Sequence, residues 1–207
     1  MVPLLAIAAA LVSASANAAP LSFKGAQLGM SLAEWRSLAP PEGAGSDAVP
    51  ACSDEPRIAA LAHNPLSATP RASDSVACAY LDLFGHTALP HSIRLDAKYQ
   101  ANGLQYLFVR GRLVEIRFKA SIDAYNDVAA MLEHQYGPPS ATTREDAPAA
   151  DGRLARVIQR WRSPLGEIVL ADPSDEPTQL RVSLSASGAD DVRPAIASTS
   201  PSPGRRR

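Results

Sequence analysis

Histidine has the widest range of chemistry of the side chains in this sequence, because it serves both as a general base and as a metal ligand. The chain has four histidines, His63, His86, His91 and His134, and Asp82 precedes the middle pair. A zinc site requires at least three converging ligands, and neither a cysteine cluster nor a second carboxylate at suitable spacing completes one. We therefore expect no metal site and interpret His86 and His91 as residues of a solvated loop.

Motifs for nucleophilic catalysis and for cation binding are missing as well. No serine stands in a G-x-S-x-G or S-x-x-K pattern, and no glycine-rich loop opens a helix as a phosphate site requires. The acidic turn Asp172–Glu176 offers oxygen ligands for a hard cation, but it lacks the spacing and the turn glycine of an EF-hand. An exposed turn is the better interpretation, and we expect neither a cofactor nor an enzyme.

Cationic residues recur at alternate positions of three predicted strands. With Ile116 turned toward the helices, Glu115, Arg117 and Lys119 face the opposite way, because successive side chains of a strand alternate between faces. The same alternation in two later strands completes a stripe, which we call the arginine face: Arg117, Lys119, Arg156, Arg160, Arg162 and Arg181. Such a stripe steers and docks an acidic protein partner. The alternative is a solvated sheet face in a chain with seventeen arginines and three lysines.

The overall charge argues against nucleic acid as the partner. The formal net charge is −1 at pH 7, whereas nucleic-acid binding requires a concentrated basic surface over the domain. We therefore expect a protein partner.

The first eighteen residues predict a signal peptide. They hold no charged side chain, carry an apolar run from Val2 to Val12, and close on a small-x-small cleavage pattern at Ala18. Cleavage before Ala19 leaves a periplasmic or secreted protein without a stable membrane anchor. A membrane span takes about 20 apolar residues, so an uncleaved anchor is the minor alternative. No basic residue precedes the run, so either the signal is weakly charged or translation starts elsewhere.

The two cysteines, Cys52 and Cys78, are expected to form a disulfide, because an exported compartment is oxidising. The bond closes a loop that is rich in proline, alanine and serine. In the chain-entropy model this closure stabilises the fold by about 3.5 kcal/mol. A long loop of this kind, residues 40–78, belongs in a compact domain only when something tethers it. The disulfide is the expected tether.

Two helices are predicted from local signals. An S-x-x-E capping box begins at Ser31 and introduces a short amphipathic helix, which Pro40 terminates. A second helix begins at Ser121, carries apolar residues at helical spacing, and ends at Gly137, whose freedom to adopt a left-handed conformation suits a helix terminus.

The remaining sequence predicts strands. They cover residues 77–83, 91–99, 104–109, 113–119, 156–162, 167–171 and 180–184. Residues 142–152 are interpreted as a flexible connection and residues 188–207 as a disordered tail. The result is a single α+β domain over residues 19–187, with an antiparallel sheet of five to seven strands and two helices packed on one face.

The run FKGAQLGMSLAEWRSL, residues 23–38, and the run YGPPS, residues 136–140, resemble uncharacterised exported proteins of Gram-negative bacteria. More distantly, they are similar to the folds of the outer-membrane assembly lipoprotein SmpA/BamE and of the β-lactamase inhibitor protein, where helices pack on one face of an antiparallel sheet. The lipid-attachment cysteine of the lipoprotein is missing. The resemblance implies a non-enzymatic protein that presents a sheet surface to another protein, and it assigns no functional residue.

These observations predict a periplasmic binding protein whose arginine face docks another envelope or exported protein. Two alternatives stay open. One is an exported hydrolase with an active site assembled from dispersed residues, and the other is a structural or stress-associated envelope protein.

Overall fold

The structure is a computed structural model that describes residues 20–43, 48–61, 63–66, 74–149, 152–174 and 176–189. The expected signal peptide, residues 1–18, and the expected tail beyond residue 189 lie outside the described residues. Within the described part of the chain, no helix is both long enough and apolar enough to cross a membrane.

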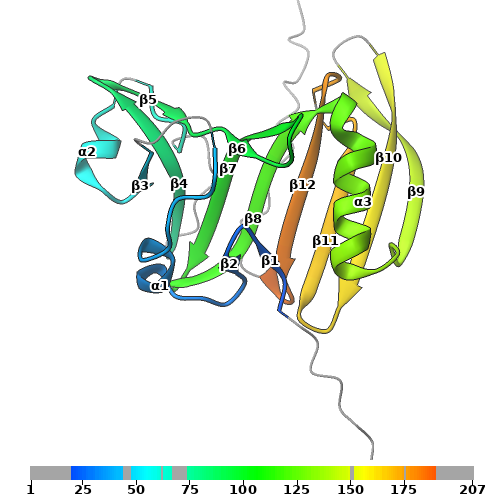
Figure 1. The fold of residues 1–207 in the computed structure, drawn as a ribbon, viewed down its shortest axis with the longest axis horizontal. Helices are drawn as coiled ribbons and strands as arrows, with labels where there is room; N and C mark the ends of the chain where they lie inside the picture. Colours follow the sequence, from blue (N-terminus) through cyan, green and yellow to red (C-terminus); the bar gives the residue numbers. More distant parts are fainter. Residues whose placement is uncertain are drawn as a thin grey trace, which may run out of the picture.

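Ten antiparallel strands form one large sheet, and two short strands form a separate hairpin (Figure 1). The helices are α1 (Leu32–Arg36), α2 (Pro56–Ala59) and α3 (Tyr125–Tyr136), the last preceded by a 3₁₀ turn at Ile122–Ala124. The strands are β1 (Ser22–Phe23), β2 (Ala26–Gln27), β3 (Val49–Cys52), β4 (Ser75–Phe84), β5 (Thr87–Pro90), β6 (Ile93–Arg94), β7 (Gln100–Val109), β8 (Arg112–Ser121), β9 (Ala141–Ala149), β10 (Gly152–Ser163), β11 (Gly166–Asp172) and β12 (Gln179–Ala186). The order across the large sheet is β3-β4-β7-β8-β12-β11-β10-β9, with β5 paired to β4 and β6 paired to β7.

The predicted α+β class, with five to seven strands and two helices on one face, is wrong. The fold is mostly β, with 52% of the described residues in strands and 17% in helices, and α3 alone among the described helices reaches seven residues. Much of the difference comes from β9, which lies where the sequence predicted a flexible connection over residues 142–152. This strand pairs with β10 over nine residue pairs, yet residues 142–146 are all exposed. An edge strand that is exposed on both faces lacks the apolar alternation by which strands are predicted.

The predicted strand over residues 91–99 is also wrong. Only Ile93 and Arg94 pair with β7. The chain then turns, because one carboxylate oxygen of Asp96 accepts hydrogen bonds from the backbone N–H groups of Lys98 and Tyr99, each at 2.7 Å. Aspartate favours such turns, since its short side chain satisfies nearby backbone donors.

The local helix signals are confirmed. At α1, Ser31 Oγ accepts from the backbone N–H of Glu34 at 3.2 Å, and the Glu34 carboxylate accepts from the Ser31 N–H at 2.6 Å. Before α3, Ser121 Oγ caps the 3₁₀ turn, and Gly137 ends the helix with a φ of 79°. The first helix is only five residues long, so it contributes one buried side chain, Trp35, rather than a full packing face.

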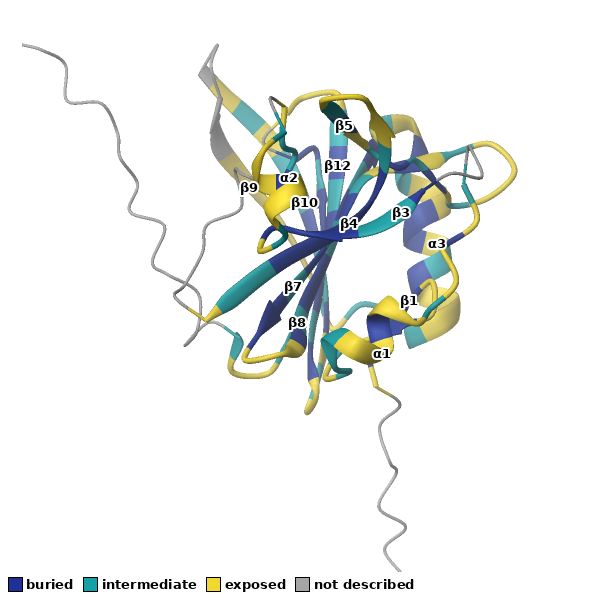
Figure 2. Cartoon of the chain, turned by 90° about the vertical axis from the view of Figure 1, so that its left-hand side faces the viewer, coloured by how far each residue is buried: buried dark blue, intermediate teal, exposed yellow. Residues whose placement is uncertain are grey.

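The sheet has a core on each of its two faces. On the inner face, the Trp35 ring packs 5.2 Å from Tyr80 and 5.0 Å from Tyr106, and residues of α3 and of the β1–β2 hairpin extend this cluster. On the outer face, Ile58 of α2 packs with Leu81 and small residues of β3, β4 and β5. Figure 2 shows α2 and α3 on different sides of the sheet, and β4 is buried in its middle, from Ala77 to Leu81. The second core covers only one end of the outer face.

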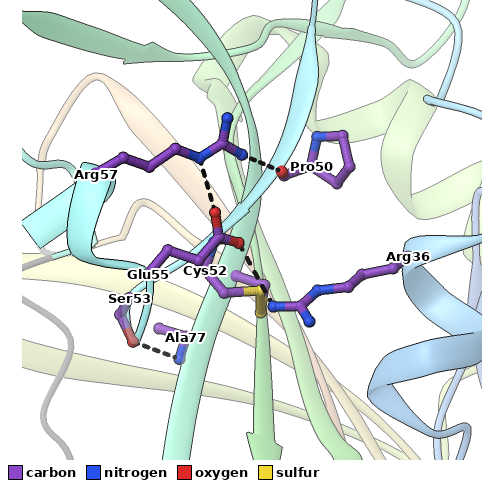
Figure 3. A network of polar contacts seen from close by, with 8 residues as sticks. Arg36, Pro50, Cys52, Ser53, Glu55, Arg57 and Ala77 are labelled. Carbon is purple, nitrogen blue, oxygen red and sulfur yellow. Dashed lines mark hydrogen bonds and ion pairs between the residues drawn. A yellow bond between two sulfur atoms is a disulfide. The ribbon is translucent and has the colours of Figure 1, made fainter.

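The predicted disulfide is confirmed. Cys52 of β3 and Cys78 of β4 lie opposite each other in the sheet and are bonded, and both side chains are fully buried. The predicted loop 40–78 therefore contains β3, α2 and the start of β4. Around the disulfide, Glu55 accepts hydrogen bonds from the Cys52 N–H at 3.0 Å and from Arg57 Nε at 2.9 Å, and it pairs with Arg36 of α1 at 3.4 Å (Figure 3).

Candidate functional site

The histidines do not assemble a catalytic or metal-binding site. His91 Nδ1 lies 3.1 Å from both carboxylate oxygens of Asp82, but its side chain is only 1% exposed. A Cβ added at Gly43 would collide with His91 Nε2, so the second ring nitrogen is covered by backbone. The other described histidines, His63, His86 and His134, are exposed. Within the described residues, no group of three His, Cys, Asp or Glu side chains is placed to hold a metal ion.

The acidic turn is a structural anchor rather than the exposed turn that the sequence predicted. Pro173 and Ser174 are buried, and the Ser174 carbonyl accepts a hydrogen bond from Arg156 Nη2 at 3.2 Å. One carboxylate oxygen of Glu176 lies 2.5 Å from Lys119 Nζ. Burial raises the pKa of Asp172. Of the two carboxylates of the turn that the structure describes, Glu176 thus pairs with Lys119 of the arginine face, and Asp172 is partly buried.

The arginine face lies on the outer side of β8, β12, β11 and β10, opposite α3 (Figure 1). Across these strands Arg117 lies opposite Ser183, Ser183 opposite Val169, and Val169 opposite Arg160. Two short side chains therefore stand between two long ones. This row makes the surface hollow along β12 and β11, with arginine walls on β8 and β10.

The neighbouring rows extend the hollow along the strands. One row runs from Arg162 through Glu167 and Ser185 to Glu115. The next runs from Ile158 through Ala171 and Arg181 to Lys119. All six members of the predicted arginine face thus lie on one face of the sheet, as the alternation predicted.

The hollow is a groove with a volume of about 840 Å³. Five members of the arginine face line it, namely Arg117, Arg156, Arg160, Arg162 and Arg181. Three carboxylates also line it, from Glu115, Glu145 and Glu167. Lys119 does not line the groove, because its ammonium group reaches Glu176 instead. With five positive and three negative side chains, the lining carries a net charge of +2.

Hydrogen bonds hold several of these arginines in place. Arg117 donates from Nε and Nη2 to the side-chain oxygen of Gln105, at 3.0 and 2.6 Å. Glu167 accepts from Arg160 Nη1 at 3.2 Å and from Arg162 Nε at 2.8 Å. Gln105 and the Ser174 carbonyl are among the acceptors that orient Arg117 and Arg156. The groove is therefore an ordered cationic surface rather than a set of loose side chains.

The arginines of the groove suit the binding of acidic groups. The described residues that line it include neither histidine nor cysteine. Guanidinium groups recognise carboxylates through two parallel hydrogen bonds. Ile158, Val169 and Ala171 add apolar contact at the floor.

The residues of this site that the sequence did not indicate include Glu145 and Gln105. Glu145 belongs to β9, which was not predicted as a strand, and it lies opposite Arg156. Gln105 was missed because the β7–β8 register shifts between Asn102 and Gln105, so its pairing with Arg117 does not follow from counting along the strand. No local sequence pattern indicates that Glu145 or Gln105 belongs to the site, because the position of each depends on how strands pair.

Comparison of the chain with protein-family models, with curated protein sequences and with solved structures finds no match. The resemblance to exported proteins and to the inhibitor-like and SmpA/BamE-like folds therefore stays a prediction.

Proposed function

We propose that this chain is an exported, non-enzymatic binding protein, periplasmic or secreted, that holds a segment of another envelope or exported protein in the groove. The observation that carries the proposal is the row from Arg117 to Arg160, where two arginine walls flank a floor of small side chains. The groove has a net charge of +2 in a chain whose net charge is −1. Such segregation of charge steers an oppositely charged partner to one surface.

The buried disulfide supports the exported location. Disulfides persist in the periplasm and outside the cell, and they are rare in the reducing cytosol. Cys52 and Cys78 are bonded in the interior of the sheet, which is compatible with an exported protein.

The position of His91 gives the hydrolase alternative no support. A general base must lie within hydrogen-bond reach of the reacting group, whereas the His91 ring is enclosed by Asp82 and Gly43. The structural alternative requires no particular surface. It predicts that the arginines of the groove are replaceable without consequence for any partner.

The test compares partner capture by three forms of the protein. Tagged wild type, the double variant Arg117→Gln/Arg160→Gln and the control Arg144→Gln are expressed in the source cell and purified from its extract. Arg144 is an exposed arginine of β9 that lies opposite Val157 and close to Tyr125 of α3, so it is on the other face of the sheet. We expect the double variant to lose, by tenfold or more, a protein that wild type and the control both retain.

Thermal unfolding of all three forms accompanies the capture experiment. Equal melting temperatures with unequal capture support docking at the groove. Equal capture by the folded double variant and by wild type would refute it and favour the structural alternative.

A further inference from the structure

We infer that the occupant of the groove is an extended polypeptide segment with carboxylates on alternate residues, lying along β12 and β11 between Arg117 and the arginines of β10. This inference rests on the proposed function, because it names the partner chemistry of the same surface. Three properties of the groove carry it: its dimensions, the spacing of its arginines and the mixture of charges in its lining.

The dimensions favour an extended chain. β8 and β10 are separated by three strand spacings, about 14 Å in all, and the arginine side chains on both walls narrow that width. An α-helix with its side chains is about 10–12 Å in diameter, which leaves no room for the guanidinium groups beside it. Along β12, the lining runs from Arg181 to Ala186, a length of about 17 Å at about 3.3 Å per residue. A single extended segment of about six residues occupies that length.

The spacing of the arginines matches an extended partner. Arg160 and Arg162 are two residues apart on β10 and lie on the same face, so they recur about every 6.6 Å along the groove. Side chains on alternate residues of an extended segment recur at the same interval, because the strand period is two residues. Carboxylates at alternate positions therefore meet guanidinium groups repeatedly, while the intervening side chains face solvent.

The mixture of charges favours a polypeptide over a uniform polyanion. Glu115, Glu145 and Glu167 lie among the five arginines of the lining. A nucleic acid or a sulfated polysaccharide carries regularly repeated negative charges. Some of these charges would lie against the three carboxylates and be repelled by them. A polypeptide sets neutral or cationic residues at those points. The apolar floor at Val169 and Ala171 also suits the Cβ atoms of an extended peptide.

The test is direct binding of labelled nine-residue peptides to the purified exported protein, followed by fluorescence anisotropy. The first peptide alternates glutamate with serine, the second has the same number of glutamates in one block, and the third alternates lysine with serine. We expect the alternating glutamate peptide to bind at least tenfold more tightly than the block peptide, and the lysine peptide not to bind. Arg117→Gln/Arg160→Gln should weaken binding of the alternating peptide at least tenfold, whereas Arg144→Gln should leave it unchanged.

Heparin serves as the polyanion probe in the same assay. Equal binding of the two glutamate peptides would overturn the alternating register. If heparin displaces the labelled peptide at a lower concentration of negative charge than the unlabelled alternating peptide does, the choice of a polypeptide is overturned. Equal binding of the two glutamate peptides leaves the proposed function intact, because a protein segment without alternating carboxylates can still be captured in a way that depends on Arg117 and Arg160. Loss of that dependence in the capture experiment, in contrast, removes the proposed function itself.

Discussion

Removing the disulfide tests how the outer core is attached to the rest of the sheet. Cys52 belongs to β3, an edge strand that pairs with β4 over only four residue pairs. The bond spans a sequence separation of 26 residues, and the chain-entropy model gives about 3.5 kcal/mol of stabilisation for a loop of that length. We expect the double variant Cys52→Ala/Cys78→Ala to lose this amount of unfolding free energy, plus a small contribution from the space left by two fully buried sulfur atoms.

The assay combines urea denaturation with hydrogen exchange. Urea denaturation of wild type and of the variant gives the difference in unfolding free energy. Hydrogen exchange shows where in the fold this stability is lost. Amides of β3 and α2 should lose protection first, because non-covalent contacts then hold this segment, chiefly four residue pairs and the packing of Ile58. Amides of β8, which lies between β7 and β12, should keep theirs. A loss below about 1 kcal/mol would refute the entropic reasoning, and equal loss of protection in β3 and β8 would refute the local attachment.

Three further predictions concern single residues and are measured by urea denaturation. Ser31→Ala removes the cap that binds the Glu34 N–H and should cost about 1 kcal/mol. Gly43→Ala should cost about 1–3 kcal/mol, because the added Cβ collides with the enclosed His91 ring. Unchanged stability of Ser31→Ala would contradict the role of the cap, and unchanged stability of Gly43→Ala would contradict the close packing of Gly43 against His91. Burial raises the pKa of Tyr106 far above its ordinary value, whereas the unfolded chain ionises near pH 10. The unfolding free energy should therefore fall as the pH rises above about 10, and Tyr106→Phe should make that fall shallower.

Interactions between residues close in sequence were predictable. The cap at Ser31 and the helix end at Gly137 are formed within one helical turn, so the sequence reports them directly. The disulfide followed from the presence of two cysteines in a chain with an exported character. The placement of Arg117 and Arg160 on the same side of the sheet followed from the two-residue period of each strand.

The size of the sheet was not predictable by the same means. β9 is exposed along residues 142–146, so it carries no apolar alternation, and its existence depends on hydrogen bonds to β10. β3 is four residues long and contains Pro50, which disfavours a strand assignment from sequence. In both cases pairing with a neighbouring strand supplies the stability that the local sequence does not.

The sequence by itself determined which residues of each strand face outward, because side chains alternate with a period of two whatever the strand pairs with. Tertiary structure alone decided which strands are neighbours and in what register, because those pairings join segments far apart in the chain. The order β8-β12-β11-β10 set Ser183 and Val169 between Arg117 and Arg160. That juxtaposition turned a stripe of arginines into a groove with a floor, two walls and room for a partner.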